Sequence, residues 1–287
     1  MKQVGLVGNP VSHSLSPLMQ QAAFDALHIE ACYFLWETPQ EQLAAKIASL
    51  RSPDVLGANI TIPYKEAVLS LVDDCDPIAA RIGAINTVVN RDGRLFGYNT
   101  DAPGFIIALH ECDAYPFDCS GKKVVILGTG GAARAAAVGL LEKDAGEVML
   151  LGRTEAHLKN IIRHLTTVSV EIQRTAHIQG ALFGNLEVSE FISHADLIVN
   201  ATPVGLKVSD PALLIDINAI PVTTLVMDMI FNPPVTPLLR CASAHGCQVL
   251  NGLSMLLYQG ALAFKLWTGR PAPIDVMQKA LGLAKES

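Results

Sequence analysis

The chain has 287 residues, of which 50% are hydrophobic and 17% are charged, and its formal net charge is −6. This length suits two domains, because a domain usually holds about 100–200 residues, and the apolar share can fill two globular cores. The charged residues form no block of one sign and no basic stripe, which argues against a nucleic-acid partner. The composition therefore favours small-molecule chemistry.

The six cysteines are scattered, and no two of them form a Cys-x-x-Cys pair. We therefore expect free thiols in a reducing compartment and no zinc site, since zinc needs clustered Cys and His ligands. Gly5 and Gly8 interrupt the N-terminal segment too early for a secretory signal. No apolar run approaches the roughly 18 residues that span a bilayer. The expected location is the cytoplasm, with no membrane partner and no metal.

Along the first hundred residues, short apolar runs alternate with amphipathic stretches, which indicates a parallel α/β sheet. Ser16-Pro17 is typical of a helix N-cap followed by proline at the first helical position. Arg91-Asp92-Gly93 is a turn signal that joins two strands into a hairpin. The predicted strands are residues 4–7, 32–36, 57–62, 84–90 and 94–99, and the predicted helices are residues 39–50 and 63–72.

A second α/β unit begins after a polar stretch at residues 115–122. Its predicted strands are residues 123–127, 147–151, 196–200 and 224–228, with a helix at 132–143. Three further helices are predicted at residues 237–245, 252–268 and 274–284. Consecutive helices do not extend a nucleotide-binding sheet, so we expect this tail to pack on the first domain. The first domain then comprises residues 1–101 and 238–287, and the second comprises residues 102–237.

Gly128-Thr129-Gly130-Gly131-Ala132 follows a predicted strand and opens an alanine-rich helix. Glycines at such a turn let backbone N–H groups approach a pyrophosphate at the positive end of a helix. Ala133 stands where the third glycine of the dinucleotide fingerprint would be, and the pattern permits alanine there. A glycine-rich turn without a ligand is an equally good interpretation of the motif alone.

The end of the next strand favours NADP over NAD. It reads Gly152-Arg153-Thr154, with no acidic residue for a ribose hydroxyl. An arginine and a hydroxyl suit a 2′-phosphate, and His157 and Lys159 add positive charge; a solvated arginine is the alternative. Residues 200–205, Asn-Ala-Thr-Pro-Val-Gly, also follow a strand and make Thr202 a candidate contact, although such residues also form simple turns.

Two polar groups in the first domain are candidates for chemistry. Lys65 falls in the first turn of the helix predicted at 63–72, where the helix macrodipole lowers the pKa of a lysine and so suits it to accept a proton. A surface lysine is the alternative. Asp101 follows a predicted strand, and its alternative role is a helix N-cap. Asn86 lies in another strand, where a buried amide needs partners.

Seven motifs follow one another along nearly the whole chain: Gly8-Asn9-Pro10 with Ser12-His13-Ser14-Leu15-Ser16-Pro17, Asn59-Ile60-Thr61-Ile62-Pro63-Tyr64-Lys65, Gly83-Ala84-Ile85-Asn86-Thr87, Gly97-Tyr98-Asn99-Thr100-Asp101, Gly128-Thr129-Gly130-Gly131-Ala132, Asn200-Ala201-Thr202-Pro203, and Asn251-Gly252-Leu253-Ser254-Met255 with Gln259. In these motifs the sequence resembles the shikimate dehydrogenase family. Seven motifs of this length in this order make the resemblance specific.

The resemblance implies an N-terminal α/β substrate domain and a Rossmann-type, doubly wound NADP-binding domain. It implies reversible, NADPH-dependent reduction of 3-dehydroshikimate to shikimate, a step of the shikimate pathway to aromatic amino acids. Lys65 and Asp101 would be the acid–base pair. Substrate would be bound by Ser14, Ser16, Asn59, Thr61, Asn86 and Gln259. Cofactor would be bound by Gly128, Gly130, Gly131, Ala132, Arg153, Thr154, Thr202, Met229 and Gly252.

Two departures from the family pattern bear on specificity. Phe231 stands where many members have a tyrosine near the nicotinamide, and His157 stands where many NADP-dependent members have a second basic residue. A quinate/shikimate dehydrogenase, or a paralogue that acts on a related cyclic hydroxy acid with NAD or NADP, is therefore the close alternative. A non-enzymatic dinucleotide-binding sensor is the alternative from another class. The family resemblance allows a monomer or a homodimer.

Overall fold

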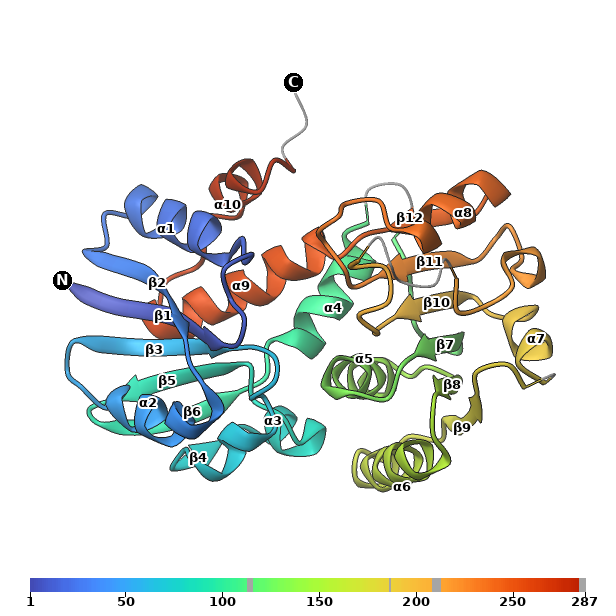
Figure 1. Cartoon of the computed structure of the whole chain (residues 1–287), viewed down its shortest axis with the longest axis horizontal. Coiled ribbons are helices and arrows are strands. Elements are labelled where there is room, and N and C mark those ends of the chain that lie inside the picture. Colours follow the sequence, from blue (N-terminus) through green and yellow to red (C-terminus); the bar gives the residue numbers. More distant parts are fainter. Residues whose placement is uncertain (113–115, 186, 208–212, 284–287) are drawn as a thin grey trace. The chain divides into compact units, whose positions relative to one another are not determined.

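The computed structural model describes residues 1–112, 116–185, 187–207 and 213–283. The chain divides into two compact units, one formed by Met1–Gly104 and Leu256–Ser287 and the other by Phe105–Met255. Each unit is built around its own six-stranded sheet, and the elements of both are labelled in Figure 1.

The first sheet has the strand order β2-β1-β3-β5-β6-β4. Its strands are β1 (Lys2–Gly8), β2 (Ala31–Glu37), β3 (Val55–Ile60), β4 (Asp74–Cys75), β5 (Thr87–Arg91) and β6 (Arg94–Tyr98). β1 pairs in parallel with β2 and β3, whereas β5 is antiparallel to both β3 and β6. The sheet is therefore mixed rather than parallel throughout.

The predicted hairpin is confirmed and accounts for this antiparallel part. β5 and β6 are joined by Asp92 and Gly93, whose φ angles of 51° and 85° are both positive. Two positive φ angles are what a tight turn needs to match the twist of the paired strands, which is why Asp-Gly is favoured there.

Two layers of helices cover the first sheet. On one face α1 (Ser16–Ala26), α9 (Leu253–Thr268) and α10 (Ile274–Ala280) enclose a core that includes Met19, Phe24, Phe264 and Trp267. On the other face the 3₁₀ turn η1 (Gln40–Gln42), α2 (Leu43–Ser49), the 3₁₀ turn η2 (Ala67–Ser70) and α3 (Pro77–Ile82) enclose a second core. The helix predicted at 39–50 is thus a 3₁₀ turn continued by an α-helix.

The helix predicted at residues 63–72 was wrong, because only η2 forms there and Lys65 lies in a turn before it. The Lys65 carbonyl accepts the Ile85 N–H at 2.7 Å. This bond to a residue far along the chain takes the place of the hydrogen bond that the carbonyl would accept within a helix. The Tyr64 hydroxyl is drawn in the same way to the Thr38 carbonyl, 2.6 Å away. Lys65 therefore does not lie in the first turn of an α-helix, and the helix macrodipole expected to act on it is absent.

The N-cap role, predicted for Ser16 and given as the alternative role of Asp101, is filled by neither residue. Ser16 is the first residue of α1 rather than its cap, and Ser14 Oγ accepts the Ser16 N–H at 3.2 Å. Asp101 begins α4 (Asp101–His110), but Asn99 supplies the capping oxygen, which accepts the N–H groups of Asp101 and Ala102. The serine and the aspartate side chains are thereby left for other partners.

The second sheet has the order β12-β11-β10-β7-β8-β9, and all its pairs are parallel. Its strands are β7 (Lys123–Leu127), β8 (Glu147–Gly152), β9 (His177–Leu182), β10 (Leu197–Asn200), β11 (Leu225–Asp228) and β12 (Gln248–Leu250). Numbered along the chain within this unit, the order is 3-2-1-4-5-6, that of a Rossmann sheet. The strand order reverses between β7 and β10, and ligands of such sheets bind at that point.

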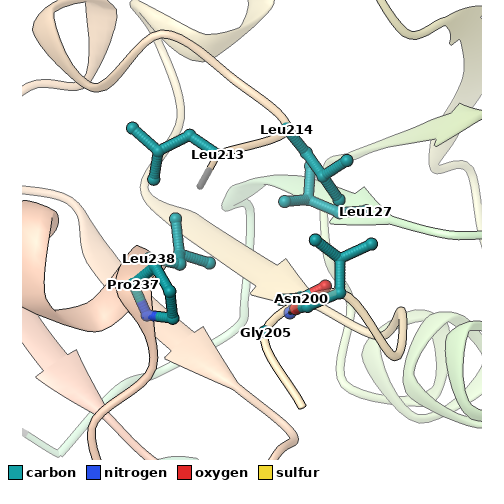
Figure 2. Close-up of a pocket in the computed structure, with 8 residues that line it drawn as sticks. Leu127, Asn200, Gly205, Leu213, Leu214, Pro237 and Leu238 are labelled. Carbon is teal, nitrogen blue, oxygen red and sulfur yellow. Dashed lines mark hydrogen bonds between the residues drawn. The ribbon is translucent and has the colours of Figure 1, made fainter. Parts of the chain in front are cut away.

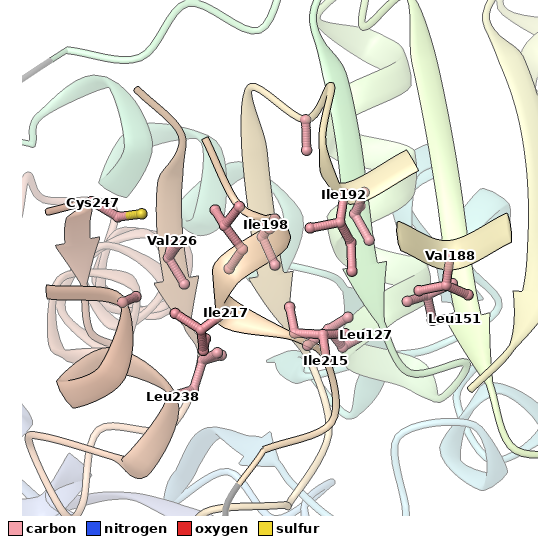
Figure 3. Packing of buried hydrophobic residues seen from close by; sticks show 14 of the residues in the cluster. Leu127, Leu151, Val188, Ile192, Ile198, Ile215, Ile217, Val226, Leu238 and Cys247 are labelled. Atoms are coloured by element: carbon pink, nitrogen blue, oxygen red, sulfur yellow. The ribbon is translucent and has the colours of Figure 1, made fainter. Parts of the chain in front are cut away.

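On one face of this sheet, apolar side chains of the strands pack against α7 (Glu187–Ile192), the 3₁₀ turn η3 (Ile217–Ala219) and α8 (Pro237–His245). Figure 3 shows this packing, with Leu127, Ile198 and Val226 from the strands facing Ile217 and Leu238. α5 (Gly131–Glu142) and α6 (Glu155–Glu171) contact β7 and β8. β9, α6, α7 and β12 were not predicted from the sequence.

The predicted boundary before residue 238 was placed too early. α8 packs on the second sheet, and β12 pairs with β11, so both belong to the second unit. Of the three helices predicted in the tail, α9 and α10 contribute to the core of the first unit, through side chains such as Phe264, Trp267 and Met277. A three-residue strand between two helices carries too little pattern to be detected in a sequence.

Candidate active site

Lys65 and Asp101 are brought together in the first unit, although they lie in different segments of the chain. The Lys65 Nζ donates to Asp101 Oδ2 at 2.7 Å. The side chains are 23% and 10% exposed, respectively, so the pair is sheltered but still reachable from outside. An amine and a carboxylate in this arrangement can pass a proton to or from a ligand that meets the open side of the pair.

Asn86 fixes the other oxygen of the Asp101 carboxylate. Its Nδ2 donates to Asp101 Oδ1 at 2.8 Å and to Thr100 Oγ1 at 2.9 Å. Its Oδ1 accepts the Thr100 N–H at 2.7 Å, which also determines which way the amide points. Asp101 is therefore held by a buried amide on one oxygen and by the lysine ammonium on the other.

The network continues from Asn86 to three further buried side chains of the first sheet, those of Asn59, Thr87 and Tyr33. Asn59 Nδ2 donates to the Asn86 carbonyl at 3.2 Å and to Thr87 Oγ1 at 3.1 Å. The Tyr33 hydroxyl donates to Asn59 Oδ1 at 2.7 Å, and burial raises the pKa of this phenol well above its usual range. Tyr33 is thus a permanent neutral donor that orients the Asn59 amide.

The remaining predicted substrate residues differ in how closely they join this network. Gln259 on α9 reaches it directly, because its Oε1 lies 3.5 Å from Asn86 Nδ2. Ser16 hydrogen-bonds to the Tyr33 hydroxyl, and the Ser16 backbone N–H donates to Ser14 Oγ. Thr61 follows β3 and packs beside Gly8; within the described part of the chain its side chain has no hydrogen bond to the network.

Sequence reasoning missed several members of this network. Asn99 and Thr100 belong to the recognised motif that ends at Asp101, so the signal was present but unused. Tyr33 lies in an apolar strand, and nothing in the local sequence marks its hydroxyl as a partner of Asn59.

In the second unit, the glycine-rich turn lies between β7 and α5. Gly128 has a φ of 118°, a conformation that favours glycine. A Cβ on Gly130 or Gly131 would meet nothing within 4 Å, so no neighbouring side chain fills the space at the start of this twelve-residue helix. The glycines thus leave backbone N–H groups accessible at the positive helix end, which suits a pyrophosphate.

The predicted 2′-phosphate residues lie next to this turn. A Cβ on Gly152, at the end of β8, would lie 2.9 Å from Thr129 Cγ2, which places the end of β8 against the turn. Arg153 and Thr154 follow it and are exposed, and Thr154 stands at the N-cap of α6 without a side-chain capping bond. His157 is exposed on α6, whereas Lys159 is engaged with Glu155 at 2.8 Å.

The turn after β10 and the segments around Met229 and Gly252 complete this edge of the sheet. A Cβ on Gly128 would lie 3.1 Å from Thr202 Cγ2, so the turns after β7 and β10 are in contact. A Cβ on Gly252 would collide with the Met229 carbonyl, so glycine is needed for this close approach. All nine predicted cofactor residues are therefore carried by the turns and helix starts at the carboxyl ends of these strands.

Among residues 1–112, 116–185, 187–207 and 213–283, no group of three His, Cys, Asp or Glu side chains could hold a metal ion. No helix in the same residues is long and apolar enough to cross a membrane.

Models of protein families match three segments of the chain. Residues 6–88 match the shikimate dehydrogenase substrate binding domain, residues 111–228 match shikimate/quinate 5-dehydrogenase, and residues 252–281 match the shikimate 5′-dehydrogenase C-terminal domain. The matched segments contain the Lys65 turn and the glycine-rich turn.

Whole-chain comparisons agree with these matches. Shikimate dehydrogenase (NADP(+)) of Moorella thermoacetica is 41% identical over 97% of this chain and 92% of its own length. The structure of shikimate 5-dehydrogenase from Thermus thermophilus, in complex with NADP(H) and shikimate, has a TM-score of 0.85 and 37% identity, covering 98% of this chain and 99% of that one. Quinate dehydrogenase from Corynebacterium glutamicum, in complex with NAD, has a TM-score of 0.87 and 28% identity, covering 97% and 98%. The chain therefore belongs to the shikimate dehydrogenase family.

Proposed function

We propose that the protein is an NADP-dependent shikimate dehydrogenase, which reversibly reduces 3-dehydroshikimate to shikimate. The observation that carries the proposal is the 2.7 Å contact between Lys65 and Asp101 within a buried polar network. Support for the cofactor comes from the open glycine-rich turn and from relatives named as NADP(+)-dependent shikimate dehydrogenases.

When bound, the nicotinamide of NADP supplies or accepts the hydride. In the direction of oxidation the substrate hydroxyl must also lose its proton, and the Lys65 Nζ in its neutral form receives it. Asp101 Oδ2, 2.7 Å away, stabilises the ammonium that results. In the direction of reduction, the Lys65 ammonium returns a proton to the carbonyl oxygen. Asn86 keeps the Asp101 carboxylate directed at the lysine throughout.

Substrate binding is assigned to the polar side chains around this pair. Ser14 and Ser16, at the start of α1, would hold the carboxylate, and Thr61 and Gln259 would contact ring hydroxyls. The Asn59 amide is already bonded to Tyr33, to Thr87 and to the backbone of Asn86. Its main contribution is therefore to shape and support the pocket, together with Asn86.

On the cofactor side, Gly128, Gly130, Gly131 and Ala132 would receive the pyrophosphate. Arg153 and Thr154 are the ligands proposed for the 2′-phosphate, since both are exposed beside the turn. Thr202, Met229 and Gly252 would contact the nicotinamide half. A histidine is not a permanent cation, so with His157 this chain would hold the phosphate less firmly than members with a second lysine or arginine.

The deciding experiment compares turnover of shikimate and of quinate, each with NADP and with NAD, using purified protein. The proposal expects the highest kcat/KM with shikimate and NADP. Absence of hydride transfer from either acid with either cofactor would contradict it. Cofactor binding without any hydride transfer would favour a dinucleotide-binding sensor instead.

A quinate/shikimate dehydrogenase, or a paralogue that acts on a related cyclic hydroxy acid with NAD or NADP, is the second candidate. The favouring observations are the likeness to the quinate dehydrogenase bound to NAD and the presence of Phe231 and His157 in this chain. A preference for quinate or for NAD in the same kinetic comparison would support it. The cytoplasmic location and the choice between a monomer and a homodimer stay predictions.

A further inference from the structure

Asp228 is a buried carboxylate that the proposed reaction does not use. It ends β11, is 0% exposed, and lies opposite Asn200, the last residue of β10. Among the described residues it has no cationic partner. A buried charge without a counter-ion is costly unless hydrogen bonds compensate for the lost water. The hydrogen-bond partners of Asp228 therefore indicate its role.

Three neutral donors surround this carboxylate. Asp228 Oδ1 accepts from Asn200 Nδ2 and from the Ile230 N–H, both at 3.0 Å, and Oδ2 accepts from Thr236 Oγ1 at 2.7 Å. A carboxylate offers acceptors only, whereas an amide or a hydroxyl would also bring a donor. The environment is therefore built for the ionised form, although burial raises the pKa of Asp228.

The partners of Asp228 extend this bonding into the loops of the carboxyl edge. Asn200 Oδ1 accepts both the N–H of Thr202, at 3.0 Å, and its hydroxyl, at 2.7 Å. Thr236 is the N-cap of α8, and its oxygen also accepts the Leu239 N–H. The Ile230 bond holds the chain immediately after Met229.

Water cannot readily replace a missing partner beside this network. The hollow next to Asn200 has a volume of about 10 Å³, at the lower limit of the space that a single water molecule needs. Figure 2 shows its wall of apolar side chains, among them Leu127, Leu213, Leu214 and Leu238. A polar group left without its partner here would stay unsatisfied.

We propose that Asp228 is a positioning residue that clamps the turn carrying Thr202 to the segment carrying Met229, and so sets the affinity for the dinucleotide. The proposal rests on the proposed function, because it takes Thr202 and Met229 as cofactor contacts. Asp228 itself touches no ligand. It acts through Asn200 and Thr236, both of which are buried with it.

The test measures the Kd for NADPH by fluorescence titration, with no alcohol substrate present. In Asp228→Asn the new amide brings a donor into a site that holds only donors, so we expect the Kd to rise roughly tenfold. Thr236→Val removes one donor and should raise the Kd several-fold, whereas Thr236→Ser keeps the hydroxyl and should restore the affinity.

Thr224→Val is the matched control, because Thr224 precedes the same strand at its opposite end. Its buried hydroxyl donates to the Ala195 carbonyl at 2.6 Å. This variant should lower the Tm without changing the Kd for NADPH. If Asp228→Asn fails to fold, the comparison of Thr236→Val with Thr236→Ser still tests the proposal.

Unchanged NADPH affinity in both Asp228→Asn and Thr236→Val would overturn the proposal. So would a loss of affinity in Thr224→Val equal to that in Thr236→Val, because the effect would then be one of general stability. Failure of the wild-type protein to oxidise shikimate would contradict the proposed function alone, since the titration needs no catalytic turnover.

Discussion

Each of the two units holds an aspartate inside a polar network, Asp101 at the start of α4 and Asp228 at the end of β11, but the networks differ in kind. Asp101 faces a lysine and keeps one side open, whereas Asp228 is fully buried among three neutral donors. An ion pair with an open side can exchange a proton with a ligand. A buried carboxyl group whose oxygens all accept from neutral donors fixes the segments that bond to it. We therefore propose the proton transfer for the first unit and cofactor positioning for the second.

Removing the lysine amine should have the largest effect. Lys65→Ala takes away the proton carrier, so turnover should fall by roughly 10²–10⁴-fold, the range for a general acid–base group. Because the glycine-rich turn belongs to the other unit, the Kd for NADPH should stay nearly unchanged. Steady-state kinetics with a parallel fluorescence titration would measure both. Lys46→Ala, which removes a lysine lying over the Trp36 ring, is the control. Unaltered turnover in Lys65→Ala would show that Lys65 has no part in the mechanism.

The next effect concerns binding in the second unit. Arg153→Ala removes the charge proposed to face the 2′-phosphate, so the Kd for NADP should rise by roughly 10–100-fold, the value of a charge-assisted hydrogen bond. The Kd for NAD, which lacks this phosphate, should change little, and kcat at saturating NADP should remain close to the wild-type value. Arg163→Ala is the control, because Arg163 is an exposed arginine within α6, whereas Arg153 precedes the N-cap of that helix. An equal loss for both dinucleotides would show that Arg153 does not read the phosphate.

The motifs and the elements with a strong local pattern could be predicted from the sequence. The hydrogen bonds between residues far apart in the chain could not. The Asp92-Gly93 hairpin and the turn at Gly128 were found because each needs a backbone conformation that few residues adopt. The helix at 63–72 was predicted wrongly because the Lys65 carbonyl bonds to Ile85, a distant contact that local propensity does not contain. Tyr33 and Asp228 were missed for the same reason: their roles depend on which strands are neighbours.

A smaller effect is expected from the support layer of the first network. Tyr33→Phe leaves Asn59 Oδ1 without its buried donor, which should cost about 1–3 kcal/mol of stability or be relieved by rotation of the amide. Either response disturbs the pocket, so the KM for shikimate should rise several-fold while kcat changes less. Tyr98→Phe, which loses only an exposed bond to Arg91, is the control. Equal KM values for shikimate in Tyr33→Phe and Tyr98→Phe would show that the Tyr33 hydroxyl does not support substrate binding.

The smallest effect is a pH dependence of stability, and it sharpens the contrast between the two aspartates. Because burial raises the pKa of Asp228, the folded state binds this proton more tightly than the unfolded state, whose pKa is about 3.9. The stability that protonation contributes is therefore fully present below about pH 3.9 and is lost as the pH rises through the raised folded pKa. Asp228→Asn cannot titrate. The unfolding free energy of the wild type relative to this variant should thus be larger near the unfolded pKa than at neutral pH, as urea denaturation of both proteins would measure. If this difference in unfolding free energy instead grew towards neutral pH, the three hydrogen bonds would lower the pKa of Asp228 by more than burial raises it. The folded protein would then stabilise the carboxylate more strongly than water does.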